Sequence, residues 1–180
     1  AFADDHKALL AQLRDTARLA NAEWAEILGI PPSAAITCVK PSGTVSQLVD
    51  AASGIHPRFA PYYLRSVRQD NKDPLTHFLK DSGVPWEPCV MAPDSTTVFF
   101  FPQKSPESAK TTEGLGALGH LEIWKNFREA WCDHNPSCTV NVREHEWLQV
   151  ASWVYGHFEQ IGGLSFLPWS DHIYKQAPYQ

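Results

Sequence analysis

Segments with the apolar spacing of helices alternate along this chain with short β-branched or aromatic segments that are typical of strands. Apolar residues three and four positions apart predict long helices over residues 5–28, 115–131 and 144–161. Shorter helices are expected over residues 45–49 and 73–81. Strands are expected at residues 35–39, 62–68, 96–101, 137–142 and 164–167. Such alternation favours α/β packing with parallel neighbouring strands, in a closed barrel or an open sheet.

The first of these helices has a pronounced apolar stripe. Its members recur at intervals of three and four residues: Leu9, Leu13, Ala17, Ala20, Trp24 and Leu28. Gly29 and the pair Pro31-Pro32 end the helix, because neither residue type continues it. The 7 Trp and 9 Phe of the chain suggest large internal contacts, or a surface that packs on more protein.

Composition and charge narrow the class of protein. With 43% apolar and 19% charged residues, the chain is globular rather than disordered. A net charge of −5 and scattered basic residues argue against a nucleic-acid binder, which needs a basic face. No apolar stretch approaches the roughly 20 residues of a membrane span, and the charged first segment is unlike a signal peptide. We therefore expect a cytoplasmic protein whose four cysteines are reduced thiols.

The most informative local feature is the turn Lys40-Pro41-Ser42-Gly43-Thr44-Val45-Ser46, which joins an expected strand to an expected helix. The start of a helix offers unpaired backbone N–H groups and a partial positive charge, which suit a phosphate. Gly43 lets an anion approach the backbone, and hydroxyl donors are present on Ser42, Thr44 and Ser46. The alternative is an ordinary helix cap by Ser42 or Thr44 that needs no ligand. The longer spacing of a Walker loop is absent.

Further motifs follow this turn in a fixed order. They are Ser53-Gly54-Ile55-His56-Pro57-Arg58, Tyr62-Tyr63-Leu64-Arg65-Ser66-Val67-Arg68, Gly163-Leu164-Ser165-Phe166-Leu167-Pro168, Asp171-His172-Ile173-Tyr174 and Gln176-Ala177-Pro178-Tyr179. Together with the turn they resemble the adenosylcobalamin-dependent ribonucleotide reductases, in particular the ribonucleoside-triphosphate reductase branch. The resemblance covers residues from about 35 to 180. The order and spacing of several motifs make it more specific than any one of them.

The resemblance implies a fold and a binding loop. Residues 1–180 would be the C-terminal portion of a ten-stranded α/β barrel of the ribonucleotide reductase type. This portion would consist of helix 5–28, a phosphate loop at 40–46, barrel strands and helices over 62–168, and an irregular tail at 169–180. In that family the Pro-Ser-Gly-Thr loop holds the substrate's phosphates at a helix start. Carried over, the binding residues are Pro41, Ser42, Gly43, Thr44 and Val45, together with Ser46.

The resemblance also implies a reaction, in which ribonucleotides, here triphosphates, become 2′-deoxyribonucleotides. Adenosylcobalamin homolysis generates a cysteine thiyl radical, and a cysteine pair supplies the electrons. The implied partners are a ribonucleotide, the missing N-terminal part of the barrel, and thioredoxin or a similar dithiol. The family's thiyl cysteine and its glutamate lie upstream of the loop, so we expect a fragment without catalytic residues that is inactive alone. The alternative is a freestanding, non-catalytic α/β module that binds a phosphorylated ligand or a partner protein.

Other polar residues are weaker candidates. His56 can bring an imidazole near the substrate or cofactor, although the structural alternative is a residue in a turn. The resemblance places the strand that begins at Ser137 near the cobalamin side, so Asn135, Ser137 and Cys138 are possible cofactor-proximal residues. The spacing Cys132-Asp133-His134-Asn135-Pro136-Ser137-Cys138 lacks the second ligand pair of a zinc site, and we expect no metal. Cys38 is expected to be a buried apolar thiol.

Overall fold

The computed structural model describes residues 4–169 and 175–179, and these residues divide into two compact units. Unit 1 comprises Ala1–Pro57 and Gly114–Trp169, and unit 2 comprises Arg58–Glu113 and Ser170–Gln180. The sequence predicted one portion of a barrel over the whole chain. In the described residues the strands form a three-stranded sheet and a two-stranded sheet, and they do not close into a barrel.

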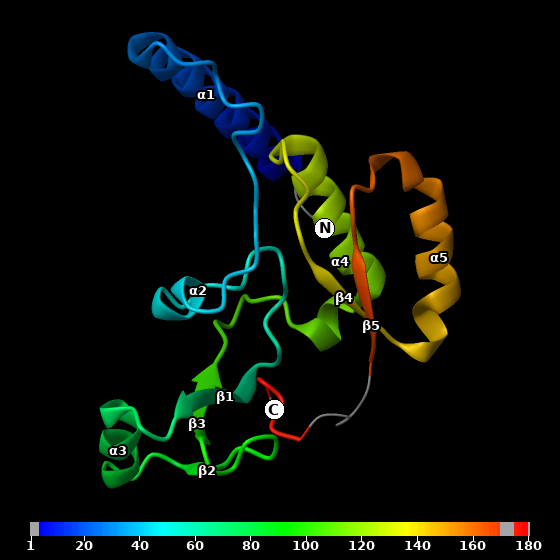
Figure 1. Ribbon diagram of the computed structural model, residues 1–180. Coiled ribbons are helices and arrows are strands. Elements are labelled where there is room, and N and C mark those ends of the chain that lie inside the picture. Colours follow the sequence, from blue (N-terminus) through cyan, green and yellow to red (C-terminus); the bar gives the residue numbers. More distant parts are fainter. Residues whose placement is uncertain (1–3, 170–174, 180) are drawn as a thin grey trace. The chain divides into compact units, whose positions relative to one another are not determined.

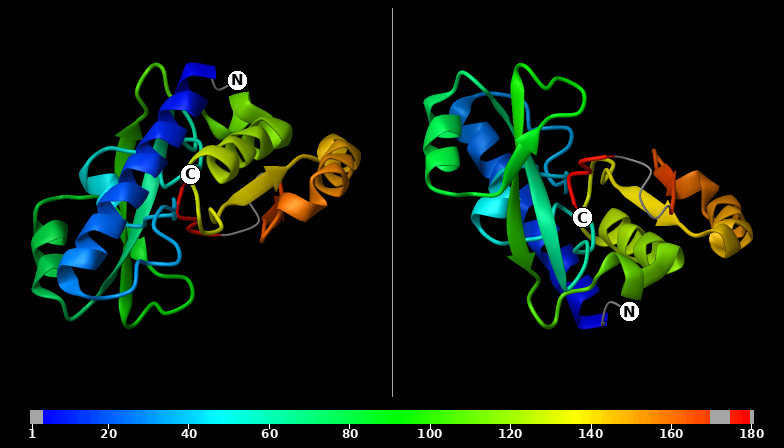
Figure 2. Two further views of the ribbon diagram at one scale, coloured as in Figure 1. Left: turned by 90° about the horizontal axis from the view of Figure 1, so that it is seen from above. Right: turned by 90° about the horizontal axis from the view of Figure 1, so that it is seen from below.

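Unit 1 contains a parallel pair of strands beside two helices. Strands β4 (Thr139–Val142) and β5 (Ser165–Pro168) pair in parallel, with Thr139 opposite Ser165. They lie side by side next to α4 and α5 (Figure 1), and the turned views show the same neighbours (Figure 2). The elements of this unit are α1 (Asp4–Leu28), α2 (Val45–Leu48), α4 (Thr112–Ala130), η1 (Glu144–Glu146), α5 (Trp147–Gly156) and η2 (Phe158–Gln160). The predicted parallel pairing is confirmed for this pair of strands.

The core of unit 1 lies between these strands and helices. Leu121 and Trp124 of α4 are fully buried, as the predicted apolar face of that helix requires. They pack with Val140 and Val142 of β4, because alternate residues of a strand point to one face. The indole N–H of Trp124 donates to the Pro136 carbonyl at 2.9 Å, so this large buried side chain leaves no unpaired donor.

Helix α4 is interrupted near its start. Gly116 has φ +67° and ψ 169°, which is outside the helical region and favours glycine. The Glu146 carboxylate accepts from the N–H of Ala117 at 2.9 Å and from the N–H of Arg143 at 2.9 Å. One distant side chain thus caps the continuous part of α4 and ties it to the turn before α5.

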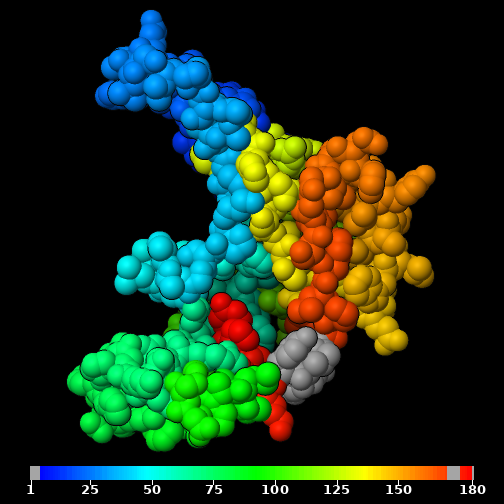
Figure 3. Space-filling model, in the orientation of Figure 1, coloured from blue at the N-terminus to red at the C-terminus, as the bar shows by residue number. Residues whose placement is uncertain are grey.

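Helix α1 contacts the rest of unit 1 through ion pairs and hydrogen bonds, and its Ala25 is buried. Lys7 pairs with Glu129, Arg14 donates to the Glu129 carbonyl at 2.8 Å, and Arg18 pairs with Asp133. The large residues of the apolar stripe are exposed, Leu9 to 50% and Trp24 to 60%. The helix surface is visible in blue in Figure 3. No helix among the described residues is long and apolar enough to cross a membrane.

Unit 2 is built on an antiparallel sheet, so the predicted parallel arrangement is wrong here. Strand β3 (Thr96–Lys104) lies between β1 (Tyr62–Asp70) and β2 (Trp86–Pro88). Helix α3 (Pro74–Asp81) begins as predicted, because the Asp73 side chain accepts from the N–H of Leu75 at 2.9 Å. The sequence did not indicate β2, which has three residues and ends in proline.

Residues of the tail complete this sheet. Gln176 is 6% exposed, and its side chain accepts from the N–H of Val90 at 2.8 Å and donates to the Pro88 carbonyl at 2.7 Å. The Pro178 carbonyl accepts from the N–H of Ser66 at 3.0 Å, which extends the edge of β1. The motif Asp171-His172-Ile173-Tyr174 lies outside the described residues.

The predicted strand at residues 35–39 is wrong, because this segment forms no strand. Its backbone is bonded by a side chain rather than by a neighbouring strand. The Asp133 carboxylate accepts from the N–H groups of Ile36 at 3.2 Å and Thr37 at 3.4 Å. Arg18 holds the pKa of Asp133 down to about 2, so this carboxylate is charged at neutral pH.

Candidate functional site

The turn before α2 has a defined conformation that Ser42 organises. The Ser42 hydroxyl accepts from the N–H of Ser46 at 3.1 Å, and the Ser42 carbonyl accepts from the Ser46 hydroxyl at 2.8 Å. Ser46 is buried, and the Thr44 side chain makes no capping hydrogen bond. Of the two residues expected to cap the helix, Ser42 therefore has this role. The Ser46 hydroxyl is directed into the turn.

Two backbone N–H groups of the turn have no acceptor in the part of the chain that the structure describes. Among the described residues, no hydrogen bond uses the N–H of Thr44 or the N–H of Val45. Thr44 is exposed, and Val45 is 65% exposed. In Figure 3 this segment, in cyan, lies on the molecular surface. The two adjacent donors are thus accessible to an anion.

A second segment, Ser53-Gly54, supports the turn from within unit 1. The Ser53 hydroxyl accepts from the N–H of Ser42 at 2.9 Å and donates to the Ser42 carbonyl at 2.9 Å. Gly54 has φ +61°, and a Cβ at this position would be 3.0 Å from the carbonyl oxygen of Lys40. The start of the turn therefore requires glycine at this position, both for the backbone conformation and for the close approach.

His56 connects this support to the strand β4. Its Nδ1 bonds the Ser53 carbonyl at 2.8 Å, and its Nε2 accepts from the N–H of Thr139 at 3.0 Å. The second contact needs a lone pair on Nε2, so the proton of the neutral ring is on Nδ1. Both ring nitrogens are used within unit 1, which supports the structural interpretation of His56.

His120 of α4 lies against His56, with the ring centroids 5.5 Å apart. It is 4% exposed, and its Nε2 is buried without a hydrogen-bond partner among the described residues. Burial, with a smaller contribution from the neighbouring His56, lowers the pKa of His120 to about 4. His120 is therefore neutral at physiological pH.

The Lys40 side chain is fixed beside the turn. Its ammonium donates to the Asn135 carbonyl at 2.8 Å and to the Ser137 hydroxyl at 2.8 Å. Both acceptors are neutral, so these contacts leave the positive charge uncompensated. The sequence predicted that Lys40 begins the turn. The two residues that accept its hydrogen bonds are about a hundred residues away in the chain.

The side chains of the possible cofactor-proximal residues make their contacts within unit 1. Besides the contacts of His56 and Ser137 above, Asn135 donates to the Gly163 carbonyl at 3.1 Å, and a Cβ on Gly162 would be 3.0 Å from its Oδ1. Cys138 is 6% exposed, and burial raises the pKa of this thiol to about 12. These contacts supply no support for cofactor binding by this chain. The described residues contain no cluster of three potential metal ligands.

Sequence reasoning missed the role of Ser53-Gly54. The only signal was the glycine itself within a polar segment, because a glycine between structured elements often marks a close backbone approach. Its partner was not evident, since Gly54 is fourteen residues from Lys40.

Known proteins resemble this chain in sequence and in structure. It is 34% identical over 160 residues to the adenosylcobalamin-dependent ribonucleoside-triphosphate reductase of Euglena gracilis, and 32% identical over 163 residues to that of Levilactobacillus brevis. Each match covers 88% of this chain and 22% of the relative. A crystal structure of a B12-dependent (class II) ribonucleotide reductase matches the whole chain with a TM-score of 0.87 at 26% identity, over 26% of its own length. No protein-family model matches the chain.

Over its own length, this chain is therefore similar in sequence and in structure to one part of the ribonucleotide reductases. The resemblance to the adenosylcobalamin-dependent (class II) ribonucleotide reductases that the motifs indicated is confirmed. The chain spans about a fifth of the length of the curated relatives it matches.

Proposed function

We propose that this chain is the part of an adenosylcobalamin-dependent ribonucleoside-triphosphate reductase that binds the substrate's phosphates. The observation that carries the proposal is the pair of accessible N–H groups at Thr44 and Val45, in a turn of defined shape. Preformed N–H donors bind an anion without a cost of reorganisation at the moment of binding.

Electrostatics support the same ligand. The Lys40 ammonium is held by two neutral oxygens, so its charge can add to the attraction for a phosphate. The Pro41 ring restricts the backbone at the start of the turn, and a Cβ added at Gly43 would meet nothing within 4 Å. A phosphate thus meets no side chain at Gly43 and two backbone donors directly after it, at Thr44 and Val45.

The chain's own contribution to the reaction is positional. In the complete enzyme, adenosylcobalamin supplies radical initiation, and this chemistry requires residues of the remaining protein. A clamp on the phosphates fixes where the ribose lies, and small misplacements of a reacting group reduce the rate strongly. We therefore assign to this chain substrate binding and orientation, and no proton or electron transfer.

The exposed stripe of α1 supports a second part of the proposal, that the chain packs against the rest of the enzyme. Leu9, Leu13, Trp24, Ile27 and Leu28 are 47–63% exposed. Burying the exposed half of one such leucine contributes about 1 kcal/mol, so a partner that covers the stripe gains several times this amount. The remaining chain length of the relatives provides such a partner. In a freestanding module the stripe would stay exposed.

The phosphate proposal is tested by amide NMR. Titrating a ribonucleoside triphosphate into the chain is expected to shift the N–H resonances of Thr44 and Val45 first. The variant Ser42→Ala loses the acceptor for Ser46 and should abolish these shifts. Leu48→Gln is the matched control, because this side chain is 86% exposed at the end of α2 and lies outside the turn. Shifts confined to surface lysines elsewhere, with Thr44 and Val45 unmoved, would contradict the proposal.

A further inference from the structure

Two thiols that are far apart in the sequence lie together at the entrance of the phosphate turn. All four cysteines of the chain are free thiols. Cys132 is 3% exposed, whereas Cys38 is half-buried and reachable from solvent. Cys38 is two residues before Lys40, where the turn begins.

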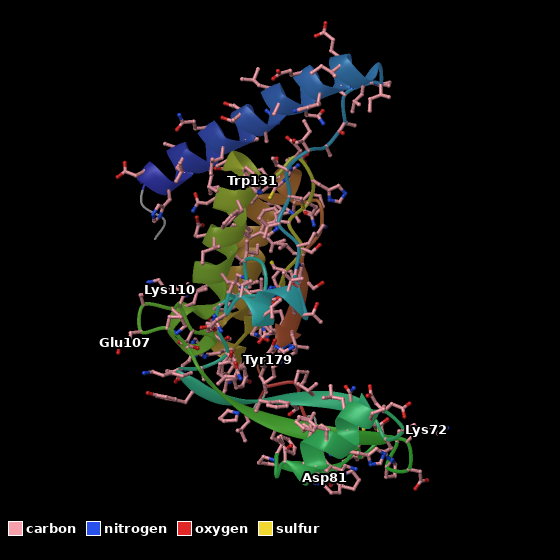
Figure 4. The ribbon with its side chains drawn as sticks, turned by 90° about the vertical axis from the view of Figure 1, so that its left-hand side faces the viewer. Lys72, Asp81, Glu107, Lys110, Trp131 and Tyr179 are labelled. Carbon is pink, nitrogen blue, oxygen red and sulfur yellow. The ribbon has the colours of Figure 1, made fainter. Side chains whose placement is uncertain are left out.

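Hydrogen bonds hold the segments around these cysteines side by side. The Thr37 hydroxyl donates to the Trp131 carbonyl, and the N–H of Asp133 donates to the Thr37 carbonyl at 2.9 Å. The indole of Trp131, labelled in Figure 4, donates to the Cys38 carbonyl at 3.2 Å. The residues on both sides of Cys132 are thus bonded to Thr37 and Cys38.

These hydrogen bonds hold the segments of Cys38 and Cys132 in direct contact, as a disulfide between them requires. A disulfide needs Cα atoms roughly 4.4–6.8 Å apart and side chains directed toward each other.

The Cys38 side chain is directed toward the segment that contains Cys132. The Cys38 thiol contacts the carbonyls of His134 at 3.6 Å and Asn135 at 3.5 Å, in the segment that contains Cys132. Burial raises the pKa of the Cys132 thiol to about 11, and the neighbouring Cys38 thiol acts in the same direction.

We propose that Cys38 and Cys132 are a redox-active thiol pair, in which Cys38 exchanges with a small-molecule disulfide and Cys132 then closes an intramolecular disulfide. The other two cysteines lack this arrangement. Cys138 is buried with no thiol beside it, and Cys89 lies in unit 2.

The reaction balances with a disulfide such as oxidised glutathione as the oxidant. The Cys38 thiolate attacks one glutathione sulfur, the glutathione S–S bond breaks, and one glutathione thiol leaves with a proton. Cys132 loses its proton and attacks the Cys38 sulfur of the mixed disulfide, and the second glutathione thiol leaves. Two protein thiols are oxidised, and one glutathione disulfide is reduced to two thiols. Because burial disfavours the Cys132 thiolate, it slows the second step.

The cross-link would act on the segment that enters the phosphate turn. In the reduced chain this segment is held on residues 131–135 by hydrogen bonds, which can open and close. A covalent bond at Cys38 fixes the approach to Lys40 and Ser42 and thereby restricts the movement of the turn. The pair is therefore a modification site through which the thiol redox state reaches the turn.

Peptide mapping tests the proposal. The chain is incubated under native conditions with oxidised glutathione, the remaining thiols are alkylated, and the digest is analysed by mass spectrometry. The expected product is a peptide pair linked through Cys38 and Cys132, with the loss of two hydrogen masses, that dithiothreitol reverses. In Cys132→Ser the exchange should stop at a stable glutathione adduct on Cys38. In Cys38→Ser neither the link nor an adduct on Cys132 should form.

Cys138→Ser is the matched control and should oxidise as the wild type does, because it removes a buried thiol that has no thiol neighbour. A wild-type map in which Cys38 carries only a glutathione adduct would overturn the proposal. A link through Cys89 or Cys138 in place of Cys132 would also overturn it. The wild-type map decides between these outcomes without the variants, so a variant that fails to fold leaves the test intact.

Discussion

Acid sensitivity of unit 1 follows from the buried imidazole of His120. The side chain is 4% exposed, lies 5.5 Å from the ring of His56, and has an unpaired Nε2 among the residues that the structure describes. Burial lowers the pKa of His120 from 6.5 to about 4 in the folded state. Between these two pH values the unfolded chain therefore binds a proton that the folded chain does not bind. The stability due to neutral His120 is complete above pH 6.5 and is lost as the pH falls toward 4.

The magnitude follows from the pKa difference. One pKa unit corresponds to about 1.4 kcal/mol, so moving from pH 7 to pH 4.5 lowers the free energy of unfolding by about 2.5 kcal/mol. Asp133 does not interfere in this window. Its pKa is held at about 2 by Arg18, so its own contribution is lost only below about pH 4.

Urea unfolding of the chain, followed by circular dichroism between about pH 4.5 and 7.5, measures this effect. In His120→Gln the imidazole is absent, and the pH dependence should flatten by about 2.5 kcal/mol over the window, whatever the variant's stability at pH 7. His77→Gln removes an exposed histidine and should keep the wild-type slope. Equal slopes for wild type and His120→Gln would refute the assignment of the acid sensitivity to His120.

Further variants probe the other contacts. Gly54→Ala should cost about 1–2 kcal/mol in urea unfolding and displace the amide resonances of the phosphate turn, because its Cβ meets the Lys40 carbonyl and its φ is +61°. Gly43→Ala, with nothing within 4 Å of the added carbon, should leave unfolding within about 0.5 kcal/mol of the wild type, and a larger loss would contradict the geometry. Asp133→Ala should cost about 1–3 kcal/mol, since two backbone N–H groups lose their acceptor, and an unchanged unfolding midpoint would contradict this role. Trp24→Gln should leave the unfolding midpoint of the chain unchanged, because the side chain is 60% exposed, and a large loss would show that the stripe already packs internally.

Local signals in the sequence predicted the elements whose causes are local. Helix α3 begins after Asp73 because this side chain caps it, and both the cap and Pro74 are visible in the sequence. Helix α1 ends where Gly29 adopts φ +65°. The turn before α2 was located from its residues, and its cap by Ser42 was one of the two alternatives.

Local sequence signals did not predict the contacts between residues that are far apart in the chain. The residues at 35–39 have the composition of a strand, yet the Asp133 carboxylate takes two of their N–H groups. The antiparallel register of Tyr62 opposite Lys104 depends on tertiary pairing that periodicity does not encode. Similarly, the support of the turn by Ser53 and the position of Lys40 depend on which residues meet in the folded unit.

Reconstitution tests the central claim, that this chain supplies the substrate-phosphate part of a class II ribonucleotide reductase. The chain is mixed with a polypeptide that corresponds to the remaining length of the Levilactobacillus brevis relative. Deoxynucleotide formation is then measured with adenosylcobalamin, a dithiol and a ribonucleoside triphosphate. The account predicts product from the mixture, none from either part alone, and a rise in KM when the chain carries Ser42→Ala. Product from this chain alone would contradict the account, as would a folded, associated mixture that forms none.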